Sequence, residues 1–265
     1  MQDVSNAKFL VTGGAGFIGS SIVETLLERG ARLVRVLDDF STGRRSNIAS
    51  ILSSIELVEG DLRDMAAVEC AVEGIDFILH QGAIPSVPRS IDDPVLTTEV
   101  NVGGTTNVLT AAARARVKRV VFASSSSVYG DSIQLPKQED MALNTLSPYA
   151  ASKGAGELFC RSFHEVFGLE TVALRYFNIF GPKQDPKSQY AAVIPRFITA
   201  LKNDEPVPVY GDGLQTRDFT YVGNVIEANL RACFAQGAAG GRFNIGCGEQ
   251  ISLLDLARGM AEAMG

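Results

Sequence analysis

Apolar residues in the first two thirds of the chain form short, nearly continuous runs, and segments with helical periodicity separate these runs. Such runs are typical of parallel strands that are buried on both faces of a sheet. The predicted strands span residues 8–12, 32–37, 55–58, 75–80, 118–124 and 171–176. The predicted helices span residues 17–29, 63–72, 94–115 and 149–167. This alternation predicts an α/β fold with a doubly wound parallel sheet and right-handed crossovers.

The pattern changes after Asn178. Five prolines and three glycines between residues 181 and 213 divide the chain into short elements. We therefore expect two parts: a sheet domain over residues 1–179 and a smaller, irregular α/β lobe over residues 180–265. The second part is predicted to end in a helix over residues 253–264.

Composition excludes several classes of protein. The 265 residues are 46% hydrophobic and 20% charged, with 24 Lys and Arg against 30 Asp and Glu and a net charge of −6. This acidic balance argues against a nucleic-acid-binding protein. No apolar run approaches the roughly 20 residues that span a bilayer, and no export signal is visible. We expect a cytoplasmic protein without nucleic-acid or membrane partners.

Cysteine and histidine are too sparse for most metal or hydrolase sites. The only such residues are Cys70, Cys160, Cys233, Cys247, His80 and His164, and no two cysteines have CxxC spacing. The cysteines are therefore expected to be free thiols in a reducing compartment. No GxSxG motif is present. We expect no metal.

Gly13, Gly16 and Gly19 follow the first predicted strand and open the next helix. In dinucleotide-binding proteins such glycines allow a tight turn, backbone approach to a pyrophosphate and close helix–strand packing. Asp38 ends the second strand about 20 residues later, where an acid binds a ribose 2′-hydroxyl and repels a 2′-phosphate. The sequence thus predicts a Rossmann-type domain that binds NAD rather than NADP; the alternative is a purely structural turn. Arg44 and Arg45 follow closely, and a role in binding a 2′-phosphate would weaken the preference for NAD. We expect them instead to be solvated loop charges.

A candidate catalytic group follows the fifth strand. Ser124–Ser127 come at its carboxyl end, where doubly wound sheets bind their ligands. Tyr149 and Lys153 have i, i+4 spacing and share one helix face. An ammonium and a cationic nicotinamide favour a phenolate, so Tyr149 is expected to act as a base near neutral pH. The alternative is a surface Tyr–Lys pair.

Together these segments resemble the extended short-chain dehydrogenase/reductase superfamily. The resemblance rests on TGGAGFIG, LDDFSTG, GDL, HQGA, NVGGTTNVL, SSSSVYG, SPYAASK, LRYFNIFGP and TRDFTYV. HQGAIPSVPRS, RYFNIFGPKQDP and YAAVIP are most similar to UDP-sugar 4-epimerases, particularly of the UDP-N-acetylglucosamine (UDP-GlcNAc) type. Related dehydratases and decarboxylases carry an acid where this chain has Ser126 and Ser127, which favours an epimerase.

The resemblance implies a mechanism with tightly bound NAD. Tyr149 would remove the proton from the sugar 4-hydroxyl as hydride leaves C4. Lys153 would bind the nicotinamide ribose and lower the pKa of Tyr149, and Ser125 would bind O4. The 4-keto sugar would then turn and take hydride back on its other face.

The resemblance also implies ligand contacts. Those to NAD are Gly13, Gly16, Phe17, Ile18, Gly19, Asp38, Asp39, Ser41, Thr42, Gly43, Asp61, Leu62, Gln81, Ala83, Asn101, Tyr149, Lys153 and Tyr176. Those to the UDP-sugar are Ser86, Ser125, Ser126, Tyr149, Asn178 and Arg217. Three alternatives stay open: Asp61 as a turn residue, Asn101 as a helix cap, and Arg217 in a surface ion pair.

Three further expectations follow from the resemblance. The chain differs from the family at Gln81-Gly82 and at Asn224, where an acid is common. Family members continue past Gly265, so the substrate lobe is expected to lack a second phosphate-binding arginine and the residue that gates the N-acetyl group. The helices near 94–115 and 149–167 are expected to form a homodimer. The alternative functions are another NAD-dependent nucleotide-sugar oxidoreductase, or an inactive NAD- and UDP-sugar-binding module in this shorter form.

Overall fold

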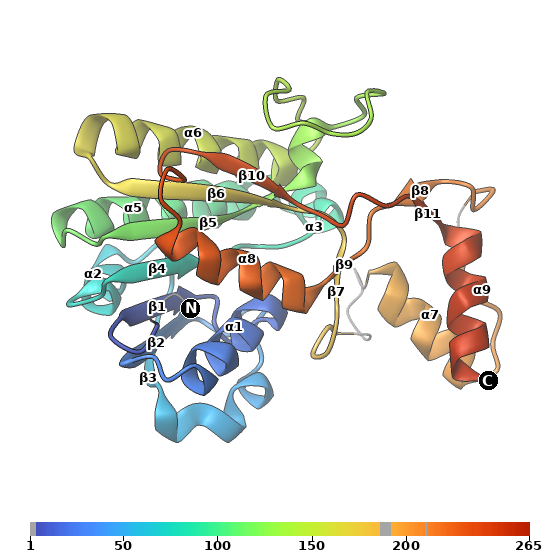
Figure 1. The fold of residues 1–265 in the computed structure, drawn as a ribbon, viewed down its shortest axis with the longest axis horizontal. Coiled ribbons are helices and arrows are strands. Elements are labelled where there is room, and N and C mark those ends of the chain that lie inside the picture. The colour runs from blue at the N-terminus through green and yellow to red at the C-terminus, as the bar shows by residue number, and fades with distance from the viewer. Residues whose placement is uncertain (1–3, 186–191, 210) are drawn as a thin grey trace.

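The computed structural model describes residues 4–185, 192–209 and 211–265. Its main feature is a seven-stranded, fully parallel sheet with the strand order β10-β6-β5-β4-β1-β2-β3 (Figure 1). The strands are β1 Lys8–Thr12, β2 Leu33–Asp38, β3 Glu56–Glu59, β4 Phe77–His80, β5 Arg119–Ser125, β6 Glu170–Tyr176 and β10 Arg242–Ile245. The Rossmann-type fold that the sequence predicts is confirmed.

Helices cover both faces of this sheet. On one face, α1 (Phe17–Glu28) and α8 (Val222–Phe234) enclose one apolar core. On the other, α2 (Met65–Val72), α5 (Thr105–Arg114) and α6 (Pro148–Phe167) enclose a second core. The apolar runs of the sequence arise because each central strand contributes to both cores. Short elements complete this layer: α3 Val87–Asp92, α4 Pro94–Thr98, η1 Arg45–Asn47, η2 Ala49–Ser54 and η4 Ser126–Tyr129.

The predicted helix over 94–115 is divided into three parts. Asp93 caps α4 by accepting a hydrogen bond from the Leu96 backbone nitrogen at 2.9 Å. A π-helical turn, η3 (Glu99–Gly104), then separates α4 from α5. Such turns are frequent at functional sites. The helical periodicity of the sequence does not distinguish this turn from an uninterrupted helix.

From Ile179 onward, some elements form a separate small lobe and others belong to the sheet domain, which differs from the predicted boundary. One set of elements forms a small lobe beside the sheet: β7 Ile179–Phe180, α7 Val193–Lys202, β8 Thr216–Arg217, β9 Thr220–Tyr221, β11 Ile251–Ser252 and α9 Leu253–Met264. In Figure 1, α7 and α9 lie side by side in this lobe. However, α8 returns to the sheet domain and β10 pairs with β6 as its seventh strand. The apolar pattern does not reveal this return, because β10 is only four residues long.

Two features bear on the environment of the protein. Among the described residues, no helix combines the length and apolar character that crossing a bilayer requires. All four cysteines are free, and Cys160 and Cys233 are buried. Burial raises the pKa of both buried thiols, which keeps them protonated and unreactive.

A buried ion pair joins α6 to the sheet. The Arg175 side chain is fully buried and donates to both carboxylate oxygens of Glu157, at 2.9 and 2.7 Å. It also donates to the Tyr129 hydroxyl at 2.7 Å, while Ser124 donates to Glu157 at 2.5 Å. Every charge of the pair therefore has partners, which is the condition under which such a pair is tolerated in a core.

Removing one member of this pair tests its role. We expect Arg175→Met to lower the free energy of unfolding by about 3–5 kcal/mol, because the Glu157 carboxylate would remain buried and unpaired. Urea denaturation measures this change. The matched control is Arg114→Met, which breaks an exposed pair with Glu69 and is expected to cost less than about 1 kcal/mol. Equal effects of the two substitutions would contradict this account.

Candidate cofactor and active site

The glycine-rich turn leaves no room for side chains. Gly13 has a φ of +65°, and a Cβ there would lie 2.7 Å from the Gly82 backbone, at the end of β4. A Cβ on Gly19 would collide with the carbonyl of Gly13. Gly16 is the N-cap residue of α1, and no side chain caps the helix. The free N–H groups at this end of α1 are therefore available to an anion such as a pyrophosphate.

A cavity runs from this turn along the carboxyl ends of the strands. Every residue that the sequence analysis assigned to NAD binding lines it, except Asn101. The Asn101 side chain instead accepts from the Ile84 backbone nitrogen at 2.7 Å and donates to the Ile84 carbonyl and to the Ser152 hydroxyl. Asn101 thus holds the loop after β4, which contributes Ala83 and Ile84 to the cavity wall.

Asp38 is fixed at the end of β2 by two backbone donors. Its carboxylate accepts hydrogen bonds from the nitrogens of Ala15 and Phe40, both at 2.8 Å. Burial raises the pKa of Asp38, and these two bonds oppose that rise. The carboxylate thereby ties the glycine turn to the loop after β2 and lies in the cavity wall, as the ribose-binding prediction requires.

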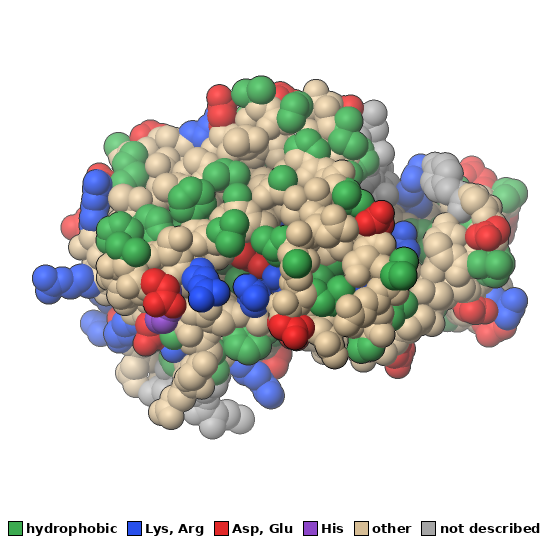
Figure 2. All heavy atoms as spheres, turned by 90° about the horizontal axis from the view of Figure 1, so that it is seen from above, with side chains coloured by type: hydrophobic (Ala, Val, Ile, Leu, Met, Phe, Trp, Pro, Cys, Tyr) green, Lys and Arg blue, Asp and Glu red, His purple; other side chains and the backbone are tan. Residues whose placement is uncertain are grey.

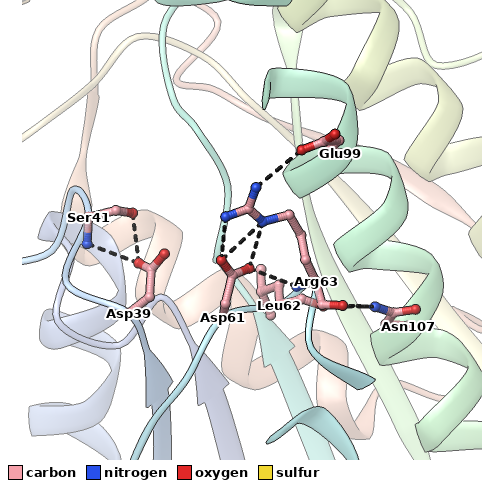
Figure 3. Close-up of polar contacts among 7 residues, drawn as sticks. All are labelled: Asp39, Ser41, Asp61, Leu62, Arg63, Glu99 and Asn107. Atoms are coloured by element: carbon pink, nitrogen blue, oxygen red, sulfur yellow. Dashed lines mark hydrogen bonds and ion pairs between the residues drawn. The ribbon is translucent and has the colours of Figure 1, made fainter. Parts of the chain in front are cut away.

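Charged side chains surround the part of the cavity near Asp61. Figure 3 shows Arg63 between Asp61 and Glu99, with ion-pair distances of 2.7 and 3.1 Å. The hydrogen bonds from Arg63 lower the pKa of Asp61. Asn107 of α5 donates to the Leu62 carbonyl at 3.0 Å, and the Asp39 carboxylate accepts from the backbone and hydroxyl of Ser41. Arg63 was not singled out from the sequence, because nothing in its spacing marks it.

Two residues of the RYFNIFGPKQDP segment that were not assigned to a ligand also reach this cavity. Lys183 and Asp185, which follow β7, line it. Lys183 pairs with Glu24 of α1 at 2.6 Å, and Asp185 pairs with Arg44. The other arginine of that loop, Arg45, pairs with Glu59, so neither arginine is simply a solvated charge.

His80 lies fully buried behind the glycine turn. The Thr105 hydroxyl donates to the Asn101 carbonyl at 2.6 Å, so it accepts from His80 Nε2, 3.0 Å away. His80 Nδ1 then accepts from the Thr12 hydroxyl at 2.6 Å. Burial lowers the pKa of His80 to about 3. This neutral imidazole therefore links β1, β4 and the π-helical turn.

The structure brings Ser125, Tyr149 and Lys153 together. Ser125 ends β5, and the Ser147 side chain caps α6 so that Tyr149 lies in its first turn. Tyr149 is hydrogen-bonded to the Ser125 hydroxyl. Lys153 Nζ lies 5.8 Å from the centre of the Tyr149 ring and donates to the Ala123 carbonyl at 2.8 Å. One strand end and one helix face thus meet at the cavity.

Desolvation sets the direction of the pKa shift of Tyr149. Burial raises it, and the hydrogen bond from Ser125 only partly opposes this rise. Lys153 is also buried, and desolvation lowers its pKa to about 8. The Lys153 ammonium donates to the Ala123 carbonyl, and the Tyr149 phenol is paired with Ser125.

Three of the residues that were predicted to contact the UDP-sugar lie at a second cavity. Ser126, Asn178 and Arg217 line one cavity between the sheet domain and the small lobe. Asn178 donates to the Asp218 carbonyl at 3.1 Å, and Arg217 donates to the carbonyl of Thr216. The bond to Thr216 involves one nitrogen of the Arg217 guanidinium, which can present further donors to an anion.

Ser86 lies apart from these three. It precedes α3 with a φ of +95°, and its buried hydroxyl has no hydrogen-bond partner among the described residues. Pro186 of the RYFNIFGPKQDP motif, and Tyr190 and Ala191 of YAAVIP, fall outside the described residues.

Comparisons with known proteins agree with this architecture. Residues 9–246 match the NAD dependent epimerase/dehydratase family. A putative UDP-glucose 4-epimerase from Methanocaldococcus jannaschii is 41% identical over 250 residues, which are 93% of this chain and 79% of that protein.

Solved structures give the same result. A UDP-N-acetylglucosamine 4-epimerase from Methanobrevibacter ruminantium superposes with a TM-score of 0.93 at 37% identity, covering 98% of this chain and 83% of that one. A dTDP-glucose 4,6-dehydratase from Streptomyces venezuelae, solved with NAD, gives 0.88 at 35% identity, covering 97% and 81%. The resemblance to extended short-chain dehydrogenases/reductases is confirmed: the chain belongs to the NAD dependent epimerase/dehydratase family.

Proposed function

We propose that this protein is a UDP-sugar 4-epimerase, which inverts C4 of UDP-GlcNAc, of UDP-glucose, or of both. The observation that carries the proposal is that Tyr149 and Lys153 line the NAD-type cavity and that Ser125 lies beside Tyr149, with serines and no acid at positions 126 and 127. Relatives named as UDP-glucose and UDP-N-acetylglucosamine 4-epimerases support it.

Each of the three residues has one task in this reaction. Bound NAD supplies a hydride acceptor beside C4 and, after the sugar has turned, the hydride donor. Tyr149 takes the proton of the 4-hydroxyl as the 4-keto sugar forms and returns it afterwards. Ser125, which lies beside Tyr149, would turn its single hydroxyl hydrogen to O4 of the bound sugar. Lys153 places an ammonium near the ring, which stabilises the phenolate once a cofactor occupies the cavity.

The cavity between the domain and the lobe is the proposed site for the UDP group. Arg217 supplies a fork of donors that suits a phosphate. Asn178 and Ser126 lie in the same wall and would bind the diphosphate and the sugar. The unpartnered Ser86 hydroxyl is a further candidate for the sugar, because a buried hydroxyl without a partner costs free energy that a ligand can recover.

Dehydratases and a decarboxylase of the same family are also similar to this chain and form the alternative. Their reactions require elimination or protonation steps in addition to hydride transfer. Ser126 and Ser127 offer only hydroxyls where those enzymes carry an acid, and the Ser127 hydroxyl is buried without a partner. The epimerase is therefore favoured over these enzymes. It is favoured over an inactive binding module because Ser125, Tyr149 and Lys153 are all present. We place the reaction in the cytoplasm, where free thiols such as these four persist.

We further propose that the protein forms a homodimer through the helical layer containing α6. Apolar side chains come to the surface in this layer (Figure 2). The exposed large apolar residues on α3, α4 and α6 are Val87, Ile91, Val95, Leu158, Phe159, Val166 and Phe167. These three helices pack against one another in one layer. Such a face is typical of a protein–protein contact.

The central test is the Tyr149→Phe variant. With NAD and UDP-GlcNAc or UDP-glucose, we expect the unaltered protein to form the galacto epimer without net NADH. Loss of the phenol is expected to lower kcat by about 10²–10⁴-fold, the usual contribution of a general base. Chromatographic separation of the epimers measures both. Tyr221→Phe, which removes an exposed phenol, is the control. Net NADH with an oxidised sugar, or full activity of Tyr149→Phe, would overturn the proposal.

The proposed role of Asp38 in binding the ribose of NAD can be tested by cofactor preference. Asp38→Asn keeps its shape but removes the charge, so we expect NAD affinity to fall about tenfold or more, since hydrogen bonds to charged groups contribute about 1.5–3 kcal/mol. The preference for NAD over NADP should narrow at the same time, because repulsion of a 2′-phosphate is lost. Equilibrium titration with both cofactors measures this. Glu59→Gln, at the end of the neighbouring strand, should leave both affinities unchanged.

The dimer has its own test. Leu158→Arg would place an unpaired charge in the proposed interface, and we expect the dimer to dissociate at least about a hundredfold more readily, equivalent to roughly 3 kcal/mol. Sedimentation velocity over a range of concentrations measures the change. Leu52→Arg, at an exposed site on η2, is the control. A monomeric unaltered protein, or a Leu158→Arg dimer of unchanged stability, would refute the interface.

A further inference from the structure

A short segment of the chain, residues 181–185, borders the cofactor cavity. It follows β7, which pairs with β9, and Figure 1 shows it on the side of α1. Lys183 and Asp185 of this segment line the cavity, as do Arg44 and Asn47, which come after β2. Two stretches that are far apart in the sequence therefore meet at the cavity that is expected to hold NAD.

Two ion pairs join the segment to the cofactor-binding layer. Lys183 Nζ lies 2.6 Å from the Glu24 carboxylate of α1 and donates to the Asn47 carbonyl at 3.2 Å. Asp185 accepts a hydrogen bond from Arg44. The four charged side chains are between 24% and 49% exposed. Partly buried pairs are screened by salt less than fully exposed ones, so both contacts can contribute.

The partners on the cofactor side are themselves fixed to the glycine-rich turn. The Arg44 backbone nitrogen donates to the Ala15 carbonyl at 2.9 Å. The Asn47 side chain donates to the same carbonyl at 2.9 Å. Glu24 lies on α1, the helix that this turn opens. The segment is thus fastened to the structure that is expected to hold the diphosphate of the cofactor.

The backbone of the segment also indicates that its contacts hold it in place. Lys183 has a φ of +68°, in the left-handed region that few residues other than glycine adopt. Such conformations persist where the surrounding contacts determine them, and they cluster at ligand clamps and switch regions. On the other side of Lys183, the Gln184 side chain donates to the Ile179 carbonyl at 3.2 Å. The turn is therefore held both to β7 and to the cofactor-binding layer.

We propose that the Lys183–Glu24 and Arg44–Asp185 pairs form a clasp at the cofactor cavity, and that NAD is released only when both pairs have opened. The clasp slows the loss of the cofactor and takes no part in proton or hydride transfer. The inference goes beyond the proposed function, because it requires only that NAD occupies the cavity. Slow release suits a reaction in which the same cofactor returns the hydride to the sugar.

A simple effect of charge would have the opposite sign. The diphosphate of NAD is anionic, so the loss of a carboxylate at this cavity would, by charge alone, strengthen binding and slow release. The clasp predicts faster release for the same substitution. Glu24 does not line the cavity, so a change at this position removes no contact with NAD. Glu24→Gln therefore tests the pair rather than the cofactor contacts of Lys183.

The experiment follows the release of radiolabelled NAD from the loaded protein after excess unlabelled NAD is added, with no sugar present. We expect Glu24→Gln and Asp185→Asn each to speed release about threefold, and the double variant about tenfold, as for two independent, partly exposed ion pairs. The association rate should not fall, because an open clasp does not hinder entry. Glu28→Gln is the matched control: it removes the same charge from an exposed position one turn further along α1 and should leave release unchanged.

Two results would overturn the clasp. One is a double variant whose release is slower than, or within about 1.5-fold of, that of the unaltered protein, since two ion pairs should then contribute nothing. The other is a fall in the association rate together with faster release, which indicates a distorted site. Thermal unfolding without NAD is expected to give similar melting temperatures for all variants, because the altered side chains are partly exposed.

Failure of the clasp is distinguishable from failure of the proposed function. NAD release is measured without sugar, so it does not depend on epimerisation. If the protein epimerises a UDP-sugar but the double variant releases NAD at the original rate, only the clasp is refuted. If the double variant releases NAD faster but the unaltered protein forms no epimer, the clasp stands and the proposed function is wrong.

Discussion

The buried ion pair between Glu157 and Arg175 is the interaction on which the active-site geometry depends. Glu157 lies on α6, one turn after Lys153 and two turns after Tyr149, while Arg175 lies on β6, next to Tyr176. Ser124 hydrogen-bonds to the same carboxylate and precedes Ser125. A single desolvated pair therefore holds the helix with the phenol and ammonium against the strands with the hydroxyl. Its cost in desolvation is offset by hydrogen bonds to every charged group.

The cofactor end depends on a different constraint, the close approach of two backbones. Gly13 and Gly82 come so near that a Cβ on Gly13 would lie 2.7 Å from the Gly82 backbone. Thr12 reinforces this contact by accepting from the Gly82 nitrogen and donating to His80. The neutral His80 extends the same chain of hydrogen bonds to Thr105 and the π-helical turn. The phosphate-binding turn and the loop after β4 are thus positioned as one unit, independently of the α6 contacts.

Local signals were sufficient for much of the site. Glycine spacing, an acid at a strand end and an i, i+4 Tyr–Lys pair are short-range patterns, and the side chains that they identify line one cavity. Asn101 shows the limit of such reasoning: it was assigned to NAD, but it satisfies both polar groups of Ile84. Burial also raises the pKa of Tyr149, which the spacing of Tyr149 and Lys153 does not reveal. Spacing shows which groups are neighbours, but not how deeply they are desolvated or which partners they choose.

The sequence by itself determined how strands and helices alternate along the first two thirds of the chain, because burial on two faces imposes an apolar pattern on every central strand. It also determined the turn chemistry, because only glycine fits there. Tertiary structure alone decided that α8 and β10 return to the sheet, that Lys183 and Asp185 reach the cofactor cavity, and that Asn229 closes a ring of hydrogen bonds with Gln81 and Tyr176. Those contacts join residues more than 45 positions apart: α8 returns because its apolar face completes a core, and the ring forms because buried polar groups must be paired, and no local pattern encodes either partner.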